Sequence, residues 1–384
     1  MAPSSLPLGC VKMLMTKTGS LSSLACMLTA RRLASASSTL CLRDDSTNIL
    51  ATTEDGPNKS SARVQRDPRS TSILLFPGQG SQFVGMGKKL LAVKAAHELF
   101  TIASDIVKFD LLKHCLEGPI EALSRTEICQ VATLVTSVAA LEVLKQSNPQ
   151  AVESCVAAAG FSVGEYAALV MGMSLSFEDA VRLVHARAAF MQEASDAVPS
   201  GLMTVFLSHQ SKLKSAMVAA RQYCKERVGI DEPVCSVANY LFCDAKVIGG
   251  NMEALEFIKA NLSEFGLRRA KKLPVSGAFH TKLMIPAAEQ FSSVLKKTHI
   301  KRPILPVYSN FFGSPYSTVQ GIRKGLEKQL YEPVKWEQLM HTIYQRPKSH
   351  AYPDTYEIGP GVQLGTILKM VNNVAHKHYH SVGV

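Results

Sequence analysis

The chain has 384 residues, of which 46% are hydrophobic and 19% are charged, and its formal net charge is +11. This composition is sufficient for one large or two modest domains with a buried core. No uninterrupted apolar run reaches the roughly 18 residues that a membrane-spanning helix needs, so no transmembrane segment is expected. The nine cysteines form no Cys-x-x-Cys pair, which argues against a disulfide framework or a zinc site.

The N-terminal segment has the composition of a mitochondrial transit peptide. Residues 1–43 are rich in serine and contain several basic residues but no Asp or Glu. A secretory signal is the alternative, but Lys12, Lys17 and several serines interrupt the apolar stretch that such a signal requires. We predict cleavage somewhere after Arg32. Residues 44–70 are polar and contain prolines, so a disordered linker is expected before the folded part.

The rest of the chain also carries a net positive charge, which suits an acidic partner or a phosphate-bearing substrate. Nucleic acid is the other class of partner to consider. The basic residues are scattered, however, with only the run RRAKK at 268–272 clustered, and no nucleic-acid-binding motif occurs. Nucleic acid is therefore not expected as a partner.

One stretch combines a short apolar strand, a serine between glycines, and a helix. Residues 155–159 are small and apolar, residues 160–164 have the pattern G-x-S-x-G, and residues 166–171 are apolar and compatible with a helix. In this order they predict a nucleophile elbow with Ser162 at the tip of a sharp turn. The helix that follows is expected to direct its free N–H groups at the serine. Because Gly and Ser are also common turn residues, an ordinary turn is the alternative.

A serine nucleophile needs a base, which is most often a histidine. Of the eleven histidines, His280 is singled out because it follows a Gly- and Ser-containing loop between an expected strand and an expected helix. The histidines near the C-terminus, His376, His378 and His380, are expected to be solvated rather than to bind a metal.

An arginine lies on the apolar face of the helix expected over 177–194. Arg187 follows Leu183 and Val184 at helical spacing, so it projects from the same face as they do. Arg182, by contrast, follows Asp179 by three residues and forms an ordinary surface pair. A buried arginine must either pair with a carboxylate inside the core or reach a cleft, and the pattern leaves both alternatives open.

A glycine-rich turn follows the strand expected over 72–76. It is not a dinucleotide-binding fingerprint, because Phe83 stands where G-x-G-x-x-G needs its third glycine, and no Gly-Lys-Ser/Thr of a P-loop follows. We expect this turn to present Gln79 at the carboxyl end of a strand, where α/β proteins place their sites.

Between 201 and 273 the expected elements follow the order β-α-β-β-α-β, which is that of a ferredoxin-like unit. The sequence therefore predicts an α/β fold: a hydrolase-like parallel-sheet domain formed by 71–200 and 274–384, with a ferredoxin-like subdomain inserted at 201–273. The expected strands are 202–207, 234–239, 246–249, 268–273, 305–308 and 355–358. The expected helices are 89–114, 119–146, 210–225, 252–265, 325–331 and 363–371.

Six blocks in this order resemble malonyl-CoA:acyl carrier protein transacylases, the malonyltransferase family. They are FPGQGSQ at 76–82, GFSVGEYAALV at 160–170, Arg187, SGAFH at 276–280, QLYEPVKW at 329–336 and EIGPG at 357–361. The resemblance extends from Ser72 to Met370. Together with the transit-like N-terminus, it implies a member located in the mitochondrial matrix that supplies mitochondrial fatty acid synthesis.

The resemblance implies a ping-pong transfer of the malonyl group from malonyl-CoA to the phosphopantetheine thiol of acyl carrier protein. Ser162 would carry the malonyl ester, and His280 would take the serine proton and return it to the leaving thiol. Arg187 would bind the malonyl carboxylate through two parallel hydrogen bonds, for which a planar guanidinium is suited.

The resemblance also implies supporting roles for main-chain groups. The backbone N–H groups of Gln79 and Val163 would form the oxyanion hole. The main-chain carbonyl of Gln329 would orient His280, so that no triad aspartate is required. No cofactor or metal is implied beyond malonyl-CoA as the substrate.

Two features leave questions of selectivity and docking open. Phe161 stands where many bacterial members have a histidine before the serine, and it cannot make polar contacts to the acyl group. Acyl carrier proteins are acidic, so the basic run 268–272 is a hypothetical docking site, with an ordinary solvated run as the alternative.

Two other functions are the alternatives. A serine esterase or thioesterase of the hydrolase type would place an acid after a core strand, between the serine and a late histidine. Here Asp196, Asp231 and Asp244 fall in or beside the inserted subdomain, and an esterase has no need of Arg187. A catalytically silent scaffold that binds acyl carrier protein would not need to retain the serine, the histidine and the arginine together.

Overall fold

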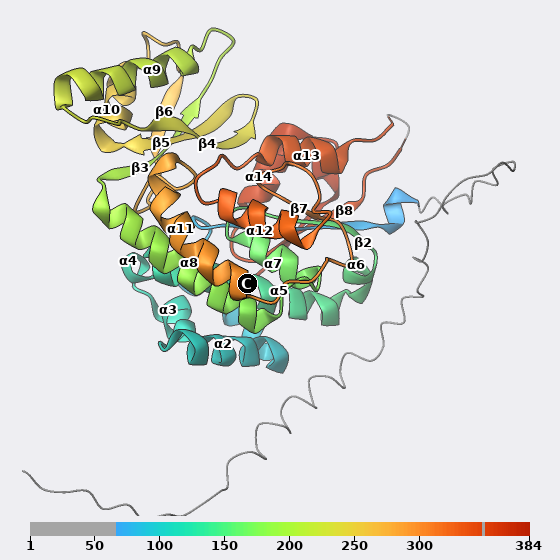
Figure 1. Ribbon diagram of the computed structural model, residues 1–384. Coiled ribbons are helices and arrows are strands. Elements are labelled where there is room, and N and C mark those ends of the chain that lie inside the picture. The colour runs from blue at the N-terminus through green and yellow to red at the C-terminus, as the bar shows by residue number, and fades with distance from the viewer. Residues whose placement is uncertain (1–66, 348–349) are drawn as a thin grey trace, which may run out of the picture. The chain divides into compact units, whose positions relative to one another are not determined.

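The computed structural model describes residues 67–347 and 350–384 (Figure 1). The predicted transit peptide, residues 1–43, lies outside the described residues, as does all of the predicted linker except its end. That end, from Asp67, contains a short 3-10 helix, η1 (Pro68–Ser70).

The larger of two sheets is parallel, and its strand order is β7-β2-β1-β8-β9. Its strands are β1 (Ser72–Phe76), β2 (Cys155–Gly160), β7 (Val307–Tyr308), β8 (Asp354–Ile358) and β9 (Tyr379–Val382). Every residue of the central strand β1 is buried, as expected of a parallel strand that is covered on both faces. Since the side chains of a strand alternate, β1 contributes to two separate cores.

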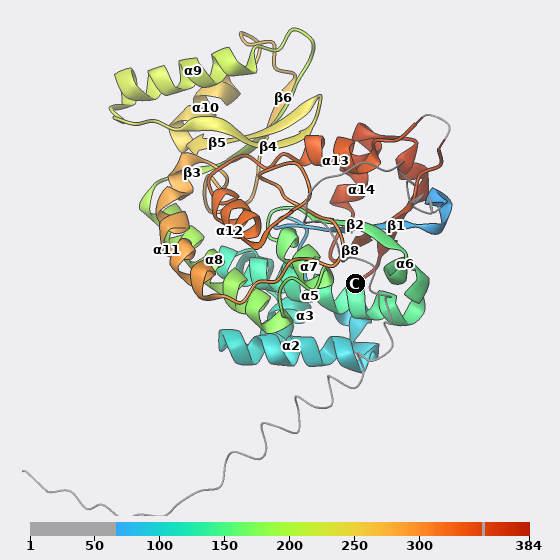
Figure 2. The ribbon, with the colours of Figure 1, turned by 45° about the vertical axis from the view of Figure 1, so that its right-hand side comes forward.

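Helices cover both faces of this sheet. Leu74 and Phe76 point into the larger core, which contains α2 (Lys94–Val107), α5 (Thr126–Ser147), α7 (Gly164–Met171), α8 (Phe177–Ala197) and α11 (Ile285–Lys297). Ile73 and Leu75 point the other way, toward α13 (Trp336–Tyr344) and α14 (Gln363–Val371). Figure 2 shows α13 and α14 on the opposite side of β1 from α5 and α7. The parallel sheet is therefore the middle layer of three, with helices on both faces.

One helix in the described part of the chain, α5, is long and apolar enough to cross a membrane by length and composition. Its most apolar window is 78% buried, and the helix packs against α2, α7 and α8. Burial of this kind is that of a core helix.

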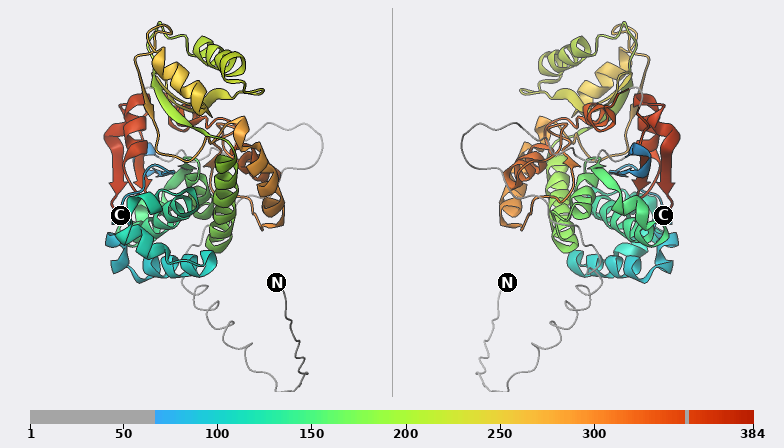
Figure 3. Two further views of the ribbon diagram at one scale, coloured as in Figure 1. Left: turned by 90° about the vertical axis from the view of Figure 1, so that its left-hand side faces the viewer. Right: turned by 90° about the vertical axis from the view of Figure 1, so that its right-hand side faces the viewer.

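The smaller sheet is antiparallel, and its strand order is β4-β5-β3-β6. Its strands are β3 (Ser200–Phe206), β4 (Cys235–Phe242), β5 (Ala245–Asn251) and β6 (Arg269–Lys272), and α9 (Leu213–Tyr223) and α10 (Met252–Ala260) pack on one face. Order and direction are those of a ferredoxin-like unit, so the predicted fold class is confirmed. The sheet and its two helices stand together at one end of the ribbon (Figure 3).

A segment of the large sheet's domain extends the small sheet. The Tyr240 N–H donates to the Val334 carbonyl, and the Val334 N–H donates to the Ala238 carbonyl, both at 2.9 Å. Beside them Lys246 Nζ lies 2.6 Å from Glu337 Oε2, and both side chains are less than a fifth exposed. The edge of β4 is thus paired rather than open, and the two sheets are tied at the block that contains Trp336.

Several element boundaries differ from those expected. The helix expected over 89–114 is interrupted at Lys108, which has a φ of 66° and ends α2, and Asp110 then caps the next helix. The remaining elements of the described chain, with those that replace the expected helices, are η2 (Lys88–Ala92), α3 (Leu111–Glu117), α4 (Ile120–Leu123), α6 (Pro149–Glu153), η3 (Cys224–Val228), η4 (Lys282–Met284), α12 (Val319–Lys328) and η5 (Ala375–His378). None of the elements expected from the sequence corresponds to α6, α11, α13 or β9.

The histidines near the C-terminus lie on and before β9. His378 and His380 are about half exposed and face Asp354 at 3.7 and 3.4 Å. Within residues 67–347 and 350–384 no group of three or more His, Cys, Asp or Glu residues is arranged to hold a metal ion. The cysteines of these residues are free thiols.

Candidate active site

The serine stands on the predicted elbow between β2 and α7. A Cβ atom on Gly160 would lie 1.9 Å from the carbonyl carbon of Gly164, and one on Gly164 would lie 2.3 Å from the Phe76 carbonyl oxygen. Both positions therefore require glycine. Ser162 has a φ of 51°, a left-handed conformation that non-glycine residues seldom adopt outside sites that hold them there.

The structure brings His280 next to this serine. Its Nε2 atom lies 3.0 Å from Ser162 Oγ, although the two residues are 118 positions apart. His280 also has a positive φ, 61°, and its backbone N–H donates to the Leu330 carbonyl at 2.9 Å. The imidazole is thus held from the backbone as well as from its ring.

The tautomer of His280 follows from its other ring contact. The Nδ1 atom lies 2.5 Å from the main-chain carbonyl of Gln329, and a carbonyl only accepts, so Nδ1 must carry the proton. That leaves the Nε2 lone pair facing the Ser162 hydroxyl. Burial, together with the charge of Arg187, lowers the pKa of His280 to about 3. The ring is therefore neutral at physiological pH and able to accept a proton.

Arg187 reaches the site instead of forming an ion pair within the core. Its side chain is fully buried, and Nη2 donates to Ser162 Oγ at 3.1 Å and to Gln329 Oε1 at 2.9 Å. Nη1 donates to the side-chain oxygen of Gln130. No carboxylate in the described ranges lies within ion-pair distance of it. Neutral acceptors leave its charge unpaired, which decides the alternative that the pattern left open.

The expectation that several N–H groups of α7 point freely at the serine is wrong. The N–H groups of Gly164 and Glu165 donate to the carbonyls of Phe161 and Ser162, at 2.9 and 3.1 Å. The turn closes on itself, so its donors are consumed. For the N–H of Val163, as for that of Gln79, the described residues provide no hydrogen-bond acceptor, and these are the two donors that the family resemblance implies.

A second group of residues supports the site and was not singled out from the sequence. Asn310 lies just after β7; its Oδ1 accepts from the Ser162 N–H and its Nδ2 donates to the Gly160 carbonyl, both at 2.7 Å. Gln130 contacts Arg187 from the buried helix α5. A polar side chain directly after a strand, or inside an apolar helix, was the available signal.

A cavity of about 400 Å³ opens onto Ser162 and His280. Its walls come from the loop 77–81, from strands of the small sheet and from the start of α14, and they are mainly apolar, as is usual for a site that takes a small organic group. The side-chain nitrogen of Gln79 and the side-chain oxygen of Asn239 are buried at this cavity without a protein partner. Polar groups of a ligand would satisfy them.

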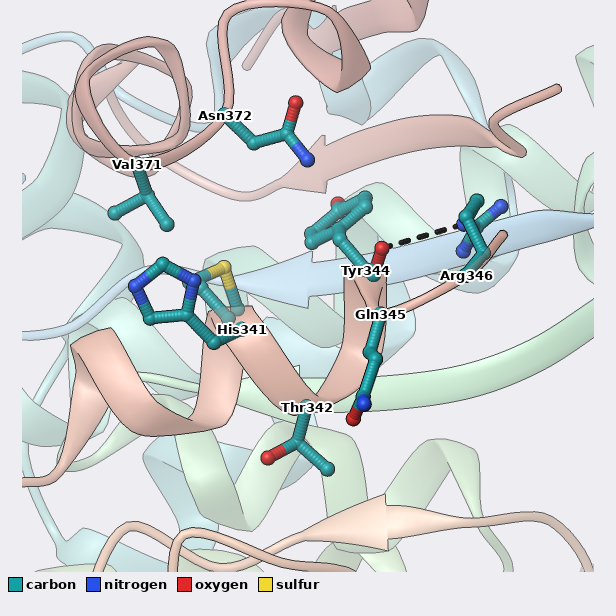
Figure 4. A pocket seen from close by; sticks show the side chains of 8 residues that line it. His341, Thr342, Tyr344, Gln345, Arg346, Val371 and Asn372 are labelled. Carbon is teal, nitrogen blue, oxygen red and sulfur yellow. Dashed lines mark hydrogen bonds between the residues drawn. The ribbon is translucent and has the colours of Figure 1, made fainter. Parts of the chain in front are cut away.

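A second cavity, of about 330 Å³, lies between the ends of α13 and α14 (Figure 4). It shares no residue with the Ser162 cavity. Its charged residue, Arg346, already donates to the main-chain carbonyls of Ile343, Tyr344 and Ala351 at 3.0 to 3.3 Å. Because the Arg346 guanidinium already binds main-chain carbonyls, it is not available to bind a ligand in this cavity.

Other residues of the sequence blocks have separate tasks. Phe161 lines the Ser162 cavity and packs edge-on against Trp336, with ring centroids 5.2 Å apart. Glu357 is buried and accepts from the N–H groups of Leu364 and Gly365 at 3.0 and 2.8 Å. It therefore holds the start of α14 and supports the loop that precedes this helix.

The basic run does not behave as one patch. Lys271 lines the Ser162 cavity. Lys272 instead lies 2.9 Å from Glu256, and the guanidinium of Arg269 stacks 4.3 Å from the ring of Phe206.

Comparisons with known proteins agree on one family. The sequence model of the acyl transferase domain family matches residues 73–354. The chain is 49% identical over 331 residues to a mitochondrial malonyl-CoA-acyl carrier protein transacylase of Mus musculus, a match that covers 86% of each chain. It is 50% identical over 323 residues to the protein of that name in Homo sapiens, covering 84% of this chain and 83% of the relative.

Solved structures are similar as well. A malonyl CoA-acyl carrier protein transacylase from Coxiella burnetii superimposes with a TM-score of 0.73 at 29% identity, covering 82% of this chain and 94% of the other. A malonyl-transacylase solved in complex with its type II PKS acyl-carrier protein has a TM-score of 0.70 at 32% identity and covers 82% of this chain and 96% of that one.

Proposed function

Because the chain belongs to the acyl transferase domain family, we propose that it transfers the malonyl group from malonyl-CoA to the phosphopantetheine thiol of mitochondrial acyl carrier protein. The relatives named above share this activity by name and match nearly the whole folded part of the chain. The observation that carries the proposal is the buried, unpaired Arg187 guanidinium 3.1 Å from Ser162 Oγ, because an acyl group that ends in a carboxylate fits that arrangement.

The first half-reaction forms a malonyl ester on the serine. Ser162 Oγ attacks the thioester carbonyl of malonyl-CoA while His280 Nε2 takes the hydroxyl proton. The carbonyl oxygen becomes an oxyanion, which the N–H groups of Gln79 and Val163 stabilise. The C–S bond then breaks, and CoA leaves as a thiol with the proton that His280 returns.

The second half-reaction reverses these steps with a new thiol. His280 takes the proton of the phosphopantetheine thiol, and the thiolate attacks the malonyl ester through the same oxyanion. The C–O bond breaks, and Ser162 regains its proton from His280. Malonyl is then carried as a thioester on the carrier protein, and the enzyme is restored.

Arg187 is assigned the binding of the malonyl carboxylate. Its guanidinium offers two N–H groups in one plane, and a carboxylate accepts from both with parallel hydrogen bonds. The carboxylate would replace the weaker contact from Nη2 to Ser162 Oγ, which frees the hydroxyl to attack. A lysine has no such planar fork.

The domains and the cellular place follow from the same assignment. We assign residues 71–200 and 274–384 to the acyltransferase domain and 201–273 to the ferredoxin-like subdomain, with 1–43 as the transit peptide. The protein acts in the mitochondrial matrix, where it supplies fatty acid synthesis. The steps above use malonyl-CoA as a substrate and need no further cofactor.

The carrier protein is assigned to the mouth of the Ser162 cavity beside β6. Lys271 lines the cavity without a carboxylate partner in the described residues, so it is placed to attract an acidic partner or the phosphate of its phosphopantetheine arm. Lys272, which is already paired with Glu256, is not assigned to docking.

Transfer to holo acyl carrier protein tests the function. The protein lacking residues 1–43 is mixed with malonyl-CoA and holo carrier protein, and malonyl-carrier protein and free malonate are both measured. Malonyl-carrier protein that disappears with S162A supports the transferase. Release of malonate without transfer would establish a thioesterase instead, and neither product would leave a non-catalytic scaffold.

A further inference from the structure

Glu165 is a buried carboxylate that the mechanism above does not use. It lies in the first turn of α7 and is completely buried. Three donors converge on it: the Tyr316 hydroxyl on Oε1, and the Asn310 N–H and Gln329 Nε2 on Oε2, the latter two at 3.1 and 2.7 Å. A fully buried carboxylate is costly unless it is satisfied in this way, so its presence beside the site needs a reason.

Gln329 connects this carboxylate with the substrate-binding arginine. Its Nε2 donates to Glu165 Oε2 at 2.7 Å and to the Ser162 carbonyl at 3.0 Å. Its Oε1 accepts from Arg187 Nη2 at 2.9 Å. The two ends of a side-chain amide are chemically opposite, one a donor and one an acceptor. Because Glu165 and the Ser162 carbonyl accept from Nε2, the amide is oriented with Oε1 toward the Arg187 guanidinium.

We propose that Glu165 is a positioning residue for malonyl selectivity, because it fixes the Gln329 amide with its oxygen toward Arg187 and so holds the guanidinium ready for the malonyl carboxylate. The inference rests on the function proposed above. Of the two groups on the amide nitrogen, Glu165 is the closer one. Burial raises the pKa of Glu165 to about 7, while the hydrogen bonds from Tyr316, Asn310 and Gln329 favour its charged form, and hydrogen bonds to a charged acceptor are the stronger kind. Without it the amide can turn over and place its NH₂ group against the guanidinium, which has only donors.

The serine and histidine depend less on this carboxylate. His280 is held by the main-chain carbonyl of Gln329 and by the Leu330 carbonyl. The Ser162 N–H is held by the Asn310 side chain. Loss of Glu165 should therefore affect recognition of the malonyl carboxylate more than the reactivity of the serine.

Two reactions separate these effects. Malonyl loading from malonyl-CoA, followed by intact mass, requires Ser162, His280 and Arg187. Sulfonylation by phenylmethylsulfonyl fluoride, a neutral reagent, requires only the serine and its base: the S–F bond breaks, an S–O bond forms, and fluoride leaves as the serine proton passes to His280. The variants are E165A, E165Q, Q329A, the double variant E165A/Q329A, and Y316F as the matched control.

For E165A we expect kcat/KM for malonyl loading to fall about tenfold to a hundredfold, as when the group that orients a metal-ligating side chain is removed. The loss should lie mainly in KM, and sulfonylation should stay within about threefold of wild type. E165Q can keep an oxygen at the Oε2 position while its NH₂ donates to Tyr316, so it should recover most of the loading. Y316F leaves the contact between Glu165 and Gln329 in place, so malonyl loading should fall far less than in E165A.

The double variant tests the route. If Glu165 acts through the Gln329 amide, malonyl loading by E165A/Q329A should be no slower than loading by the less active of the two single variants. The reason is that the effects of substituting contacting residues that act as a unit are not additive. Additive losses would overturn the proposal, as would equal losses in both reactions, or unchanged malonyl loading in E165A. If the wild-type protein itself forms no malonyl adduct while it is still sulfonylated, the proposed function fails and this inference fails with it. Should E165A not fold, E165Q and Q329A decide the matter by the same comparison.

Discussion

The Nη2 atom of Arg187 lies 3.1 Å from the Oγ atom of Ser162, so a fully buried guanidinium adjoins the hydroxyl at the tip of the elbow. In a malonyl ester the carboxylate is separated from the reacting carbonyl by one methylene. Acyl groups of this length can therefore have one end on the serine and the other on the arginine, whereas a neutral acetyl group leaves the buried charge without a partner.

Arg187→Ala should lower kcat/KM for malonyl loading at least about tenfold to a hundredfold, since a hydrogen bond to a charged group contributes about 1.5–3 kcal/mol. Loading from acetyl-CoA, measured by intact mass under the same conditions, should not fall with it. Arg187→Lys keeps the charge without the planar fork and should recover only part of the loss. If malonyl and acetyl loading fall together, the arginine is structural.

His280→Ala should lower the rate of malonyl loading by about a hundredfold to ten-thousandfold, the usual contribution of a general base. The binding of malonyl-CoA, measured by its KM, should change far less. A loss confined to KM would contradict the role assigned to the imidazole.

The lowered pKa of His280 also predicts the pH dependence. Since the pKa in the folded protein is about 3 rather than 6.5, the loading rate should not fall as the pH is lowered through 6.5. Between these two values the unfolded chain binds the extra proton and the folded chain does not, so this residue makes stability fall as the pH is lowered through that window. The free energy of unfolding, measured with urea at pH 7 and pH 5, should therefore fall less between these two pH values in His280→Ala than in wild type.

Gly164→Ala should destabilise the protein and abolish loading. The added Cβ would lie 2.3 Å from the carbonyl oxygen of Phe76, the last residue of β1, and 2.6 Å from that of Pro77, and these main-chain atoms cannot move aside as the end of a flexible side chain can. Overpacking of this kind costs about 1–3 kcal/mol, measurable by urea unfolding. Gly321→Ala, whose nearest neighbour is a side-chain oxygen at 3.1 Å, is the control and should stay within about 1 kcal/mol of wild type.

Charge reversal at Lys271 should weaken transfer to the carrier protein. In Lys271→Glu we expect a higher KM for acyl carrier protein that is most evident at low salt, because exposed charges are screened as salt is added. Lys272→Glu is the matched control, since that lysine faces Glu256. If both variants raise the KM for acyl carrier protein equally, or if neither variant changes it, this part of β6 is not the docking surface.

The elbow, the base and the small sheet could be predicted because their signals are local. Strand, turn and helix around Ser162 are contiguous, and the order of elements from 201 to 273 determines a familiar strand order. The group behind the serine was missed because it is assembled from distant segments: Asn310 is 148 positions from the Ser162 N–H that it binds. Nothing in the local pattern around Glu165 shows that a tyrosine and a glutamine from later helices and loops will reach it.

The elements that were missed or misplaced have similar causes. In α12 the glycines at 321 and 325 lower helix propensity, yet Gly325 leaves room for the Tyr316 ring, whose hydroxyl would lie 2.5 Å from a Cβ there. Among the described strands β9 stands at the edge and pairs with β8, and its short polar sequence does not alternate clearly. In both cases the tertiary neighbours, rather than the local sequence, decide the structure.

The most direct measurement is the mass of the protein after brief mixing with malonyl-CoA, followed by mapping of the modified peptide and a chase with holo acyl carrier protein. The account predicts one malonyl group on Ser162 that passes to the carrier protein, absent in Ser162→Ala and strongly reduced in Arg187→Ala. A malonyl group on another residue, an adduct that the carrier protein cannot remove, or equal labelling of wild type and Arg187→Ala would contradict it.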